Sequence, residues 1–477
     1  MTIIIKTCIV TPMNNRGVGI YFINYKNSVL GTGGVGTVSR DMIKYNPDIH
    51  FVYWDGSKAD RDIDLGIKTP RELHKIVHIK YAKAYLWPVL HGLPSKINPD
   101  KLTHVRQKVL VLVELIAKKI YKFASDKSQQ ESDRIYWIND YTSIALIGKL
   151  RKLDKNSTII FTFRTPFGVK NQYPKFYDDD ILLLKGLLQS DCITFHRQND
   201  LEHFIKFIDD KFHKEISRIN SKKNNATVTL KNDKHITLSV APMGNNKSYR
   251  KGILHNNSTR LFYKNIKSYH QDNVMITGIS RFEESKGIEY EIDCINTLLQ
   301  THPELSGKFV FLRYSYMSED KIQSKEYNAF MDKVITKITI INNKYGTDKW
   351  KPIVYDFNKK LTDYEVAGLL MASDILIIAS HADGFNHLAL EAIYSQKRTG
   401  AIQLLLSDIG VTDYIHGYKK LSHNIEDDVK ILYESIKSKG IRNWFTQQRL
   451  NSSANKLSSR RWMTQIIKLA NNIRERK

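Results

Sequence analysis

The stretch NVMITGISRFEESKGIEYEIDCINTLLQ, residues 273–300, contains the pattern that decides the fold. It opens with NVMITGI, a short apolar run typical of a strand that is buried on both faces of a parallel sheet. A polar loop follows, and YEIDCINTLLQ then spaces its apolar residues as an amphipathic helix does. A strand, a loop and a helix in this order form the repeating unit of an α/β protein.

The same alternation recurs along the chain. Further strand candidates are TIIIKTCIV, DIHFVYW, RIYWIND, STIIFTF, DCITFH, KFVFLRY, PIVYDF, DILIIAS and GAIQLLLS. Helical patterns between them are TSIALIGKLRKL, ILLLKGLL, LEHFIKFIDDKF and EVAGLLMA. NATVTLKNDKHITLSV alternates instead about Asn232 and Asp233, which predicts a β-hairpin. The pattern as a whole predicts two Rossmann-like halves.

The polar stretch GNNKSYRKGILHNNSTR, residues 244–260, is typical of a linker. We therefore expect an N-terminal Rossmann-like domain over residues 1–255 and a C-terminal Rossmann-like domain over residues 256–455. The basic closing segment, residues 456–477, predicts a helix that packs back on the N-terminal domain.

Composition narrows the function classes. The chain has 477 residues and a formal net charge of +24, but its lysines are spread along the whole length without a compact basic block. This favours solvated helix faces over a specific nucleic-acid partner. No apolar run reaches the length of a membrane span, and the N-terminus is typical of a strand rather than a signal peptide. Three distant cysteines indicate a reducing compartment, so we expect a cytoplasmic protein.

GTGGVGT, residues 31–37, matches the G-x-G-x-x-G pattern of dinucleotide-binding loops. That fingerprint requires a strand directly before the glycines, whereas TIIIKTCIV ends near Val10. VGTVSRDMIKY predicts a helix after them. From this segment alone, a phosphate-binding loop and a glycine-rich turn without a ligand both stay open.

Eight segments, taken in order, resemble the trehalose-6-phosphate synthase family of retaining GT-B glycosyltransferases. They are YWINDYTS, FTFRTPFG, LLQSDCITFHR, APMGNN, ISRFEESKGI, HPELSGK, YGTDKWKP and DGFNHLALE. The resemblance implies an α/β fold of two Rossmann-like domains that face each other across a cleft. It also implies that the glycine loop meets the diphosphate of a nucleotide diphosphate sugar, with Gly33 and Gly34 as the contact residues.

On the donor side, the resemblance places Arg281 and Lys286 on the diphosphate, where fixed cations stabilise the leaving group. Asp383 and the backbone of Asn386, His387 and Leu388 are implied to hold the sugar and phosphates, and Glu391 the ribose hydroxyls. If the cations Arg281 and Lys286 do that work, the reaction needs no metal, so we expect no cofactor and no metal. UDP-glucose is the first expectation for the donor.

On the acceptor side, the resemblance places Asp140 at the reaction centre, with Tyr141 kept beside it and Trp87 packed on the acceptor. Several positions depart from the family pattern. Arg164 stands where the family has a donor-contacting histidine, and His78 stands where it has a tyrosine. The two arginines that serve the acceptor phosphate are replaced, one by Glu319 and one missing unless Arg16 takes its place.

These departures leave several hypotheses open. The first is a retaining hexosyltransferase with a changed acceptor: an uncharged sugar, a cyclitol, or a sugar phosphate held from a new direction. The second is an ordinary trehalose-6-phosphate synthase in which His78, Arg40 or Arg313 replaces the phosphate ligands. The third is a non-catalytic homologue that binds a nucleotide sugar. The oligomeric state, including a homo-oligomer, stays open.

Overall fold

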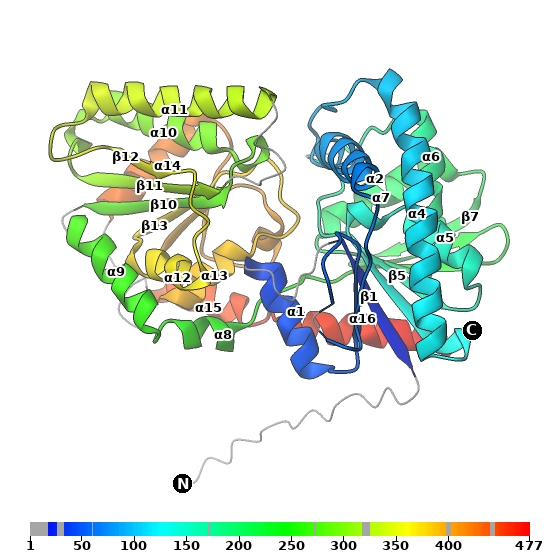
Figure 1. Cartoon of the computed structure of the whole chain (residues 1–477). Coiled ribbons are helices and arrows are strands. Elements are labelled where there is room, and N and C mark those ends of the chain that lie inside the picture. The colour runs from blue at the N-terminus through cyan, green and yellow to red at the C-terminus, as the bar shows by residue number, and fades with distance from the viewer. Residues whose placement is uncertain are drawn as a thin grey trace, which may run out of the picture.

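The computed structural model describes residues 18–25, 33–59, 61–169, 172–270, 273–316, 325–396, 402–438 and 444–477. They form two lobes, each built on a sheet with helices on both faces (Figure 1). TIIIKTCIV, Arg16 and Glu319 lie outside these residues. The first lobe contains the sheet of β1–β9 and the second lobe the sheet of β10–β15.

Within the described residues the first sheet has nine strands in the order β3-β2-β1-β4-β5-β6-β9-β8-β7. Their bounds are β1 Gly19–Asn24, β2 His50–Tyr53, β3 Leu65–Gly66, β4 Arg134–Asn139, β5 Thr158–Thr162, β6 Cys192–Phe195, β7 Ile216–Lys222, β8 Asn225–Leu230 and β9 His235–Val240. All neighbours are parallel except the pairs β7–β8 and β8–β9. The predicted hairpin about Asn232 and Asp233 is confirmed as β8–β9.

The helices of the first lobe cover both faces of its sheet. They are α1 Gly33–Tyr45, α2 Arg71–Lys75, the π-helix η1 Ile76–Leu86, α3 Trp87–Leu90, α4 Pro99–Lys127, α5 Leu146–Leu153, α6 Asp178–Leu184 and α7 Gln198–Phe212, with short 3₁₀ turns η2 Glu131–Asp133, η3 Tyr141–Ser143 and η4 Lys185–Gln189. The long α4 begins at the cap Asn98, whose side chain accepts from the N–H of Asp100. Its buried stripe includes Val105, Leu112 and Ile116.

Within the described residues the second sheet has six parallel strands in the order β12-β11-β10-β13-β14-β15. Their bounds are β10 Val274–Arg281, β11 Phe309–Tyr316, β12 Ile353–Asp356, β13 Ile375–Ile378, β14 Gln403–Leu406 and β15 Lys419–Lys420. One face carries α10 Ile288–Thr301, α11 Lys325–Tyr345 and α14 Ile425–Lys437, and the other α9 Asn257–Tyr269, α12 Asp363–Ala372 and α13 His387–Ser395 (Figure 1). The short turns are η5 Glu284–Lys286, η6 Pro303–Leu305 and η7 Gly410–Asp413.

The expected linker over residues 244–260 is wrong, because most of this stretch is helical. α8 spans Lys247–Ile253, and α9 begins at Asn257. Each helix starts at an asparagine cap: Asn246 accepts from the N–H of Tyr249, and Asn256 from the N–H of Ser258. Asparagine favours both turns and helix N-caps, so composition alone did not separate the two.

The sequence also suggested that no strand directly precedes the glycine loop, because TIIIKTCIV ends near Val10, and this expectation is wrong. β1, GIYFIN, is buried along its whole length and ends at Asn24, so only residues 25–32 separate it from α1. Gly33, Gly34 and Gly36 therefore lie in the first turn of a helix that follows a strand after a short loop. A six-residue strand flanked by glycine and asparagine was hidden by the more apolar TIIIKTCIV.

A hydrophobic core joins the lobes behind the sheets. It contains Val38 and Met42 of α1, Trp137 of β4, and Tyr394 of α13. The last helices, α15 Trp444–Ala454 and α16 Ser459–Arg474, complete it, and α16 crosses from the second lobe to lie against the first (Figure 1). Trp462 of α16 lies 5.1 Å from Trp137, ring centre to ring centre.

Candidate active site

The strand orders place a topological switch point in each lobe, between β1 and β4 and between β10 and β13. Ligands of open α/β sheets bind outside the carboxyl ends of the strands at such points. Asp140 follows β4, Arg281 ends β10, and Asp383 follows β13. The carboxyl ends of the two sheets face each other, because Gly384 after β13 lies against the backbone of Arg164 after β5. Lys96 of the first lobe also pairs with Glu284 of the second at 2.8 Å.

Lys286 and Asp383 form an ion pair at the second switch point. The Lys286 Nζ donates to Asp383 Oδ2 at 2.7 Å, and Asn386 Nδ2 donates to the same oxygen at 3.1 Å. Burial alone would raise the pKa of Asp383, but Lys286 and Asn386 outweigh it and lower that pKa below its ordinary value. The structure thus brings two predicted donor residues into direct contact.

Arg281 reaches toward the first lobe from the end of β10. Its guanidinium lies 3.1 Å from Glu283, and its side chain is 44% exposed. Glu283 raises the pKa of Arg281, so the group is a permanent cation. Burial raises the pKa of Tyr141, Asp140 raises it further, and Arg281 opposes them, which places the predicted acceptor residue Tyr141 within electrostatic reach of Arg281.

Asp140 has φ 65° and ψ 165°, a backbone region that is almost reserved for glycine. The N–H groups of Tyr141 and Arg164 and the hydroxyl of Thr165, at 3.3 Å, bond its carboxylate. Burial nevertheless raises its pKa above the ordinary value, with the Arg164 cation opposing. Strain of this kind gathers at functional sites, where the surrounding structure holds it in place.

Arg164, the departure on the donor side, lies beside Asp140 at the end of β5. Its guanidinium carbon lies 5.5 Å from the ring centre of Phe22. Burial lowers the pKa of Arg164 to about 10, although Asp140 opposes that shift. The residue therefore lies beside Asp140 as a cation at neutral pH.

The loop from Asp383 to Asn386 packs directly against the first lobe. A Cβ on Gly384 would lie 1.9 Å from the carbonyl oxygen of Arg164, so only glycine fits there. Asn386, with φ 69°, caps α13 by accepting from the N–H of Leu388 at 3.1 Å. That N–H is thus already bonded in this structure, while α13 begins at His387 beside the ion pair.

Glu391 lies in the second turn of α13 and is 5% exposed. It lines a cavity with Ser280, Tyr316 and Leu388, among others. Its Oε1 accepts a short hydrogen bond from Nη2 of Arg250 in α8, and the two side chains form an ion pair. Burial raises the pKa of Glu391 to about 6, with Arg250 opposing, so the carboxylate depends on its partners for its charge near neutral pH.

Aromatic rings gather on the acceptor side. Trp87 stacks on His91 at 4.0 Å, and His78 stacks on Tyr25 at 3.8 Å. The Tyr25 hydroxyl lies 2.8 Å from His74 Nε2. Burial lowers the pKa of His91 to about 4, with the nearby Lys286 acting in the same direction. His91 is therefore a neutral ring that stacks on Trp87 and lies near Lys286.

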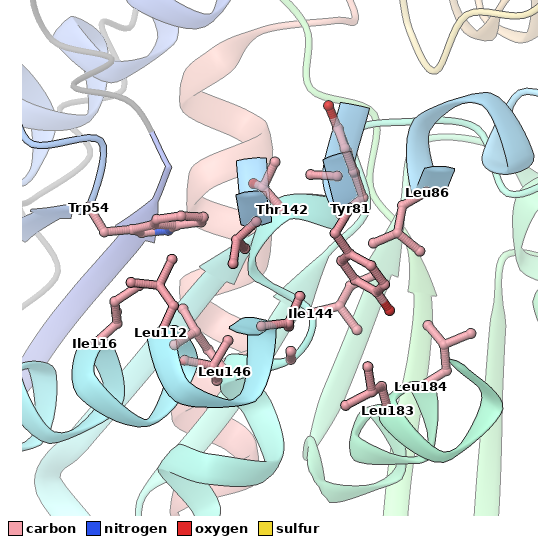
Figure 2. Close-up of a pocket in the computed structure, with 16 residues that line it drawn as sticks. Trp54, Tyr81, Leu86, Leu112, Ile116, Thr142, Ile144, Leu146, Leu183 and Leu184 are labelled. Carbon is pink, nitrogen blue, oxygen red and sulfur yellow. The ribbon is translucent and has the colours of Figure 1, made fainter. Parts of the chain in front are cut away.

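A narrow apolar cavity lies behind the loop of Tyr141 and Thr142 (Figure 2). Trp54, Tyr81 and leucine and isoleucine side chains surround it, and its volume is about 20 Å³. A space of this size and character holds at most one water molecule. It is too small for a sugar and belongs to the packing beneath the site.

Sequence reasoning missed Tyr25, His91 and Arg250. Tyr25 follows a strand that the sequence did not reveal, and Arg250 lay in the supposed linker. His91 is four residues after Trp87, a spacing that puts both on one face of a helical turn and so could have been noticed.

Two of the proposed substitute phosphate ligands are engaged elsewhere. Arg313 is 1% exposed and pairs with Glu291 at 2.8 Å. Arg40 of α1 lies 3.7 Å from Asp363. Among the described residues, no group of three or more His, Cys, Asp or Glu side chains is arranged to hold a metal ion. Within the same ranges, every helix is too short or too polar to cross a membrane.

Two Rossmann-like lobes with facing switch points are the architecture of the GT-B class of glycosyltransferases. Similarity to known proteins supports this class. The model of glycosyltransferase family 20 matches residues 60–472. The chain belongs to this family and is a glycosyltransferase, and the resemblance to trehalose-6-phosphate synthases is confirmed.

Individual relatives agree with this assignment. The chain is 25% identical over 397 residues to the alpha,alpha-trehalose-phosphate synthase (UDP-forming) of Candida albicans, covering 81% of this chain and 78% of that one. The crystal structure of an alpha,alpha-trehalose-phosphate synthase (UDP-forming) from Burkholderia xenovorans, in complex with glucose-6-phosphate, matches this chain with a TM-score of 0.83 at 16% identity. The match covers 95% of this chain and 100% of that one. A structure from E. coli bound with UDP-2-fluoro glucose has a TM-score of 0.83 at 17% identity, with 95% and 98% covered.

Proposed function

We propose that this glycosyltransferase moves a glucosyl group from UDP-glucose to a sugar or sugar-like acceptor with retention of configuration and without a metal. The observation that carries the proposal is the ion pair of Lys286 and Asp383 at one switch point, facing Asp140 at the other. The names of the relatives, UDP-forming synthases, favour UDP as the leaving group.

In this mechanism the C1–O bond to the diphosphate breaks while the acceptor hydroxyl forms a new bond to C1 on the same face. The hydroxyl proton passes to the departing phosphate oxygen. Arg281 and Lys286 stabilise the charge that grows on that phosphate, an effect that is larger in the transition state than in the ground state. Gly33 and Gly34 at the start of α1 supply backbone N–H groups for the same diphosphate. Asp140 positions the sugar hydroxyls at the reaction centre.

Two acceptors compete within this proposal. A changed acceptor is supported by two candidate phosphate ligands that are engaged elsewhere: Arg313 pairs with Glu291 at 2.8 Å, and Arg40 lies 3.7 Å from Asp363. A phosphomonoester, with nearly two negative charges, calls for cations that are not already neutralised. Glucose 6-phosphate is supported by the relatives, which are trehalose-phosphate synthases.

The test is to measure UDP release from UDP-glucose with glucose 6-phosphate and, separately, with unphosphorylated sugars and cyclitols. The changed-acceptor proposal expects an unphosphorylated compound to give the higher kcat/KM. A kcat/KM of about 10⁴ M⁻¹s⁻¹ or more with glucose 6-phosphate would instead establish the second acceptor.

A further inference from the structure

Arg250 of α8 contacts a residue of the donor site from outside the donor sheet. Its side chain is 1% exposed, and its Nη2 donates to Glu391 Oε1 in a short ion pair. The same nitrogen lies 4.0 Å from Asp363 Oδ1. Burial raises the pKa of Glu391, and the fully buried side chain of Asn245, which lies near that carboxyl, lowers it. Arg250 of α8 and Asn245 just before that helix thus both lie near the Glu391 carboxylate.

α8 lies at a junction of the molecule. Its cap residue Asn246 bonds Asp41 of α1, and its Tyr249 hydroxyl donates to Asp363 of α12 at 2.9 Å. In Figure 1 the helix lies at the lower edge of the second lobe, below α12. The position of Arg250, and with it that of Glu391, is therefore fixed from both lobes.

A contribution to stability explains this pair poorly. A buried ion pair is seldom more stable than apolar side chains of the same volume. The Arg250 Nε is buried without a hydrogen-bond partner, which adds a desolvation cost. Meanwhile Glu391 lines the cavity formed with Ser280, Tyr316 and Leu388. The buried ion pair, with its desolvation cost, thus involves a residue that lines a cavity.

We propose that Arg250, with Asn245, is a positioning residue that fixes and charges Glu391 so that its carboxylate binds the ribose hydroxyls of the donor nucleotide. This rests on the proposed function, because it needs a nucleotide donor. A carboxylate accepts hydrogen bonds only, so a charged and oriented Glu391 selects a sugar that presents hydroxyl donors. The diphosphate end of the nucleotide, held by Arg281 and Lys286, does not depend on Arg250.

The test compares ligands with and without ribose. Binding of UDP and of pyrophosphate is measured by calorimetry for the wild type, R250M, R250K and the control K251M, which changes an exposed neighbour on α8. We expect R250M to weaken UDP about tenfold or more while pyrophosphate changes less than about twofold, with R250K between R250M and the wild type and K251M unchanged. The melting temperature of each variant shows whether it folds. If R250M does not fold, R250K is compared with the wild type instead.

Equal weakening of both ligands, or UDP binding that is unchanged in the Arg250 variants, would overturn the role of Arg250 and leave the proposed function intact. A wild type that binds pyrophosphate but not UDP would overturn the proposed UDP donor, and the ribose role of Arg250 with it.

Discussion

Asp140 keeps a side chain where the backbone favours glycine, with φ 65° and ψ 165°. Such a conformation costs on the order of 1–3 kcal/mol. The carboxylate must therefore contribute something that folding does not require. Its position beside Arg164, at the end of β4, agrees with the role at the reaction centre that we propose for Asp140. The conformation itself has no signature in the sequence, whereas the resemblance did identify the residue.

Asp140→Gly should separate stability from activity. We expect the free energy of unfolding to stay equal or rise by about 1 kcal/mol, because glycine relieves the strain. Turnover should fall at least about 10²-fold, the scale of losing one group that stabilises the transition state. The control Asn224→Gly relieves a φ of 65° at a turn between β7 and β8 and should leave turnover unchanged. Denaturant unfolding and initial rates measure both quantities, and an active Asp140→Gly enzyme contradicts the role of Asp140.

Lys286→Ala and Arg281→Ala should each weaken nucleotide diphosphate binding by about 1.5–3 kcal/mol, the range for hydrogen bonds to charged groups. Lys96→Ala removes a half-exposed cation of the same cleft, paired with Glu284, and should change the affinity little. Calorimetric titration with UDP checks the three variants. An unchanged affinity in both Lys286→Ala and Arg281→Ala would remove the assigned diphosphate site.

At the scale of elements, the sequence predicted most of the sheet framework because buried parallel strands are continuous apolar runs. Every strand candidate from DIHFVYW to GAIQLLLS overlaps an observed strand, and the predicted hairpin corresponds to β8 and β9. β1 was missed because it is short, and α8 because its asparagine caps resemble a linker. The approach of Gly384 to Arg164 was beyond prediction, since it joins segments of two lobes through contacts that no local pattern encodes.

Gly384→Ala should disturb that contact. The new Cβ would lie 1.9 Å from a backbone oxygen, so the loop of Asp383 must shift, and we expect a loss of about 1–3 kcal/mol in stability together with weaker nucleotide binding. Gly252→Ala on α8 is the matched control, because nothing lies within 4 Å of its Cβ, and it should keep or slightly raise the melting temperature. Thermal unfolding with and without UDP compares them. A Gly384→Ala protein as stable as Gly252→Ala would show that the lobes are not tightly apposed there.

At the scale of the whole molecule, further contacts outside the candidate site join the two lobes. Arg197 of the first lobe pairs with Asp413 and Asp408 of the second at 2.9 and 2.6 Å. Behind it, His196 is 2% exposed and lies 5.5 Å from Phe385 of the second lobe, ring centre to ring centre. The interface thus combines ion pairs of the largely buried Arg197 with a buried neutral imidazole, and its stability should depend on pH.

His196→Asn should flatten the pH dependence of stability. Burial lowers the pKa of His196 from 6.5 to about 4, with Arg164 acting in the same direction and the Ala241 carbonyl opposing. The unfolded chain therefore binds the proton first, so this contribution is complete above pH 6.5 and is lost as the pH falls toward 4. Between pH 7 and 5 the wild type should lose roughly 1–2 kcal/mol more than His196→Asn. Denaturant unfolding at both pH values measures this, with the exposed His213→Asn as control, and equal slopes would contradict it.

The most direct measurement of the central claim is proton NMR of the reaction itself. The enzyme is incubated in EDTA with UDP-glucose and a mixture of glucose 6-phosphate, unphosphorylated sugars and cyclitols, and the first product is observed before it can equilibrate. We predict that UDP appears together with a new α-glucosidic anomeric signal, because the leaving phosphate and the acceptor share one face of the sugar. A β-linked first product, or turnover that EDTA abolishes, would contradict the account.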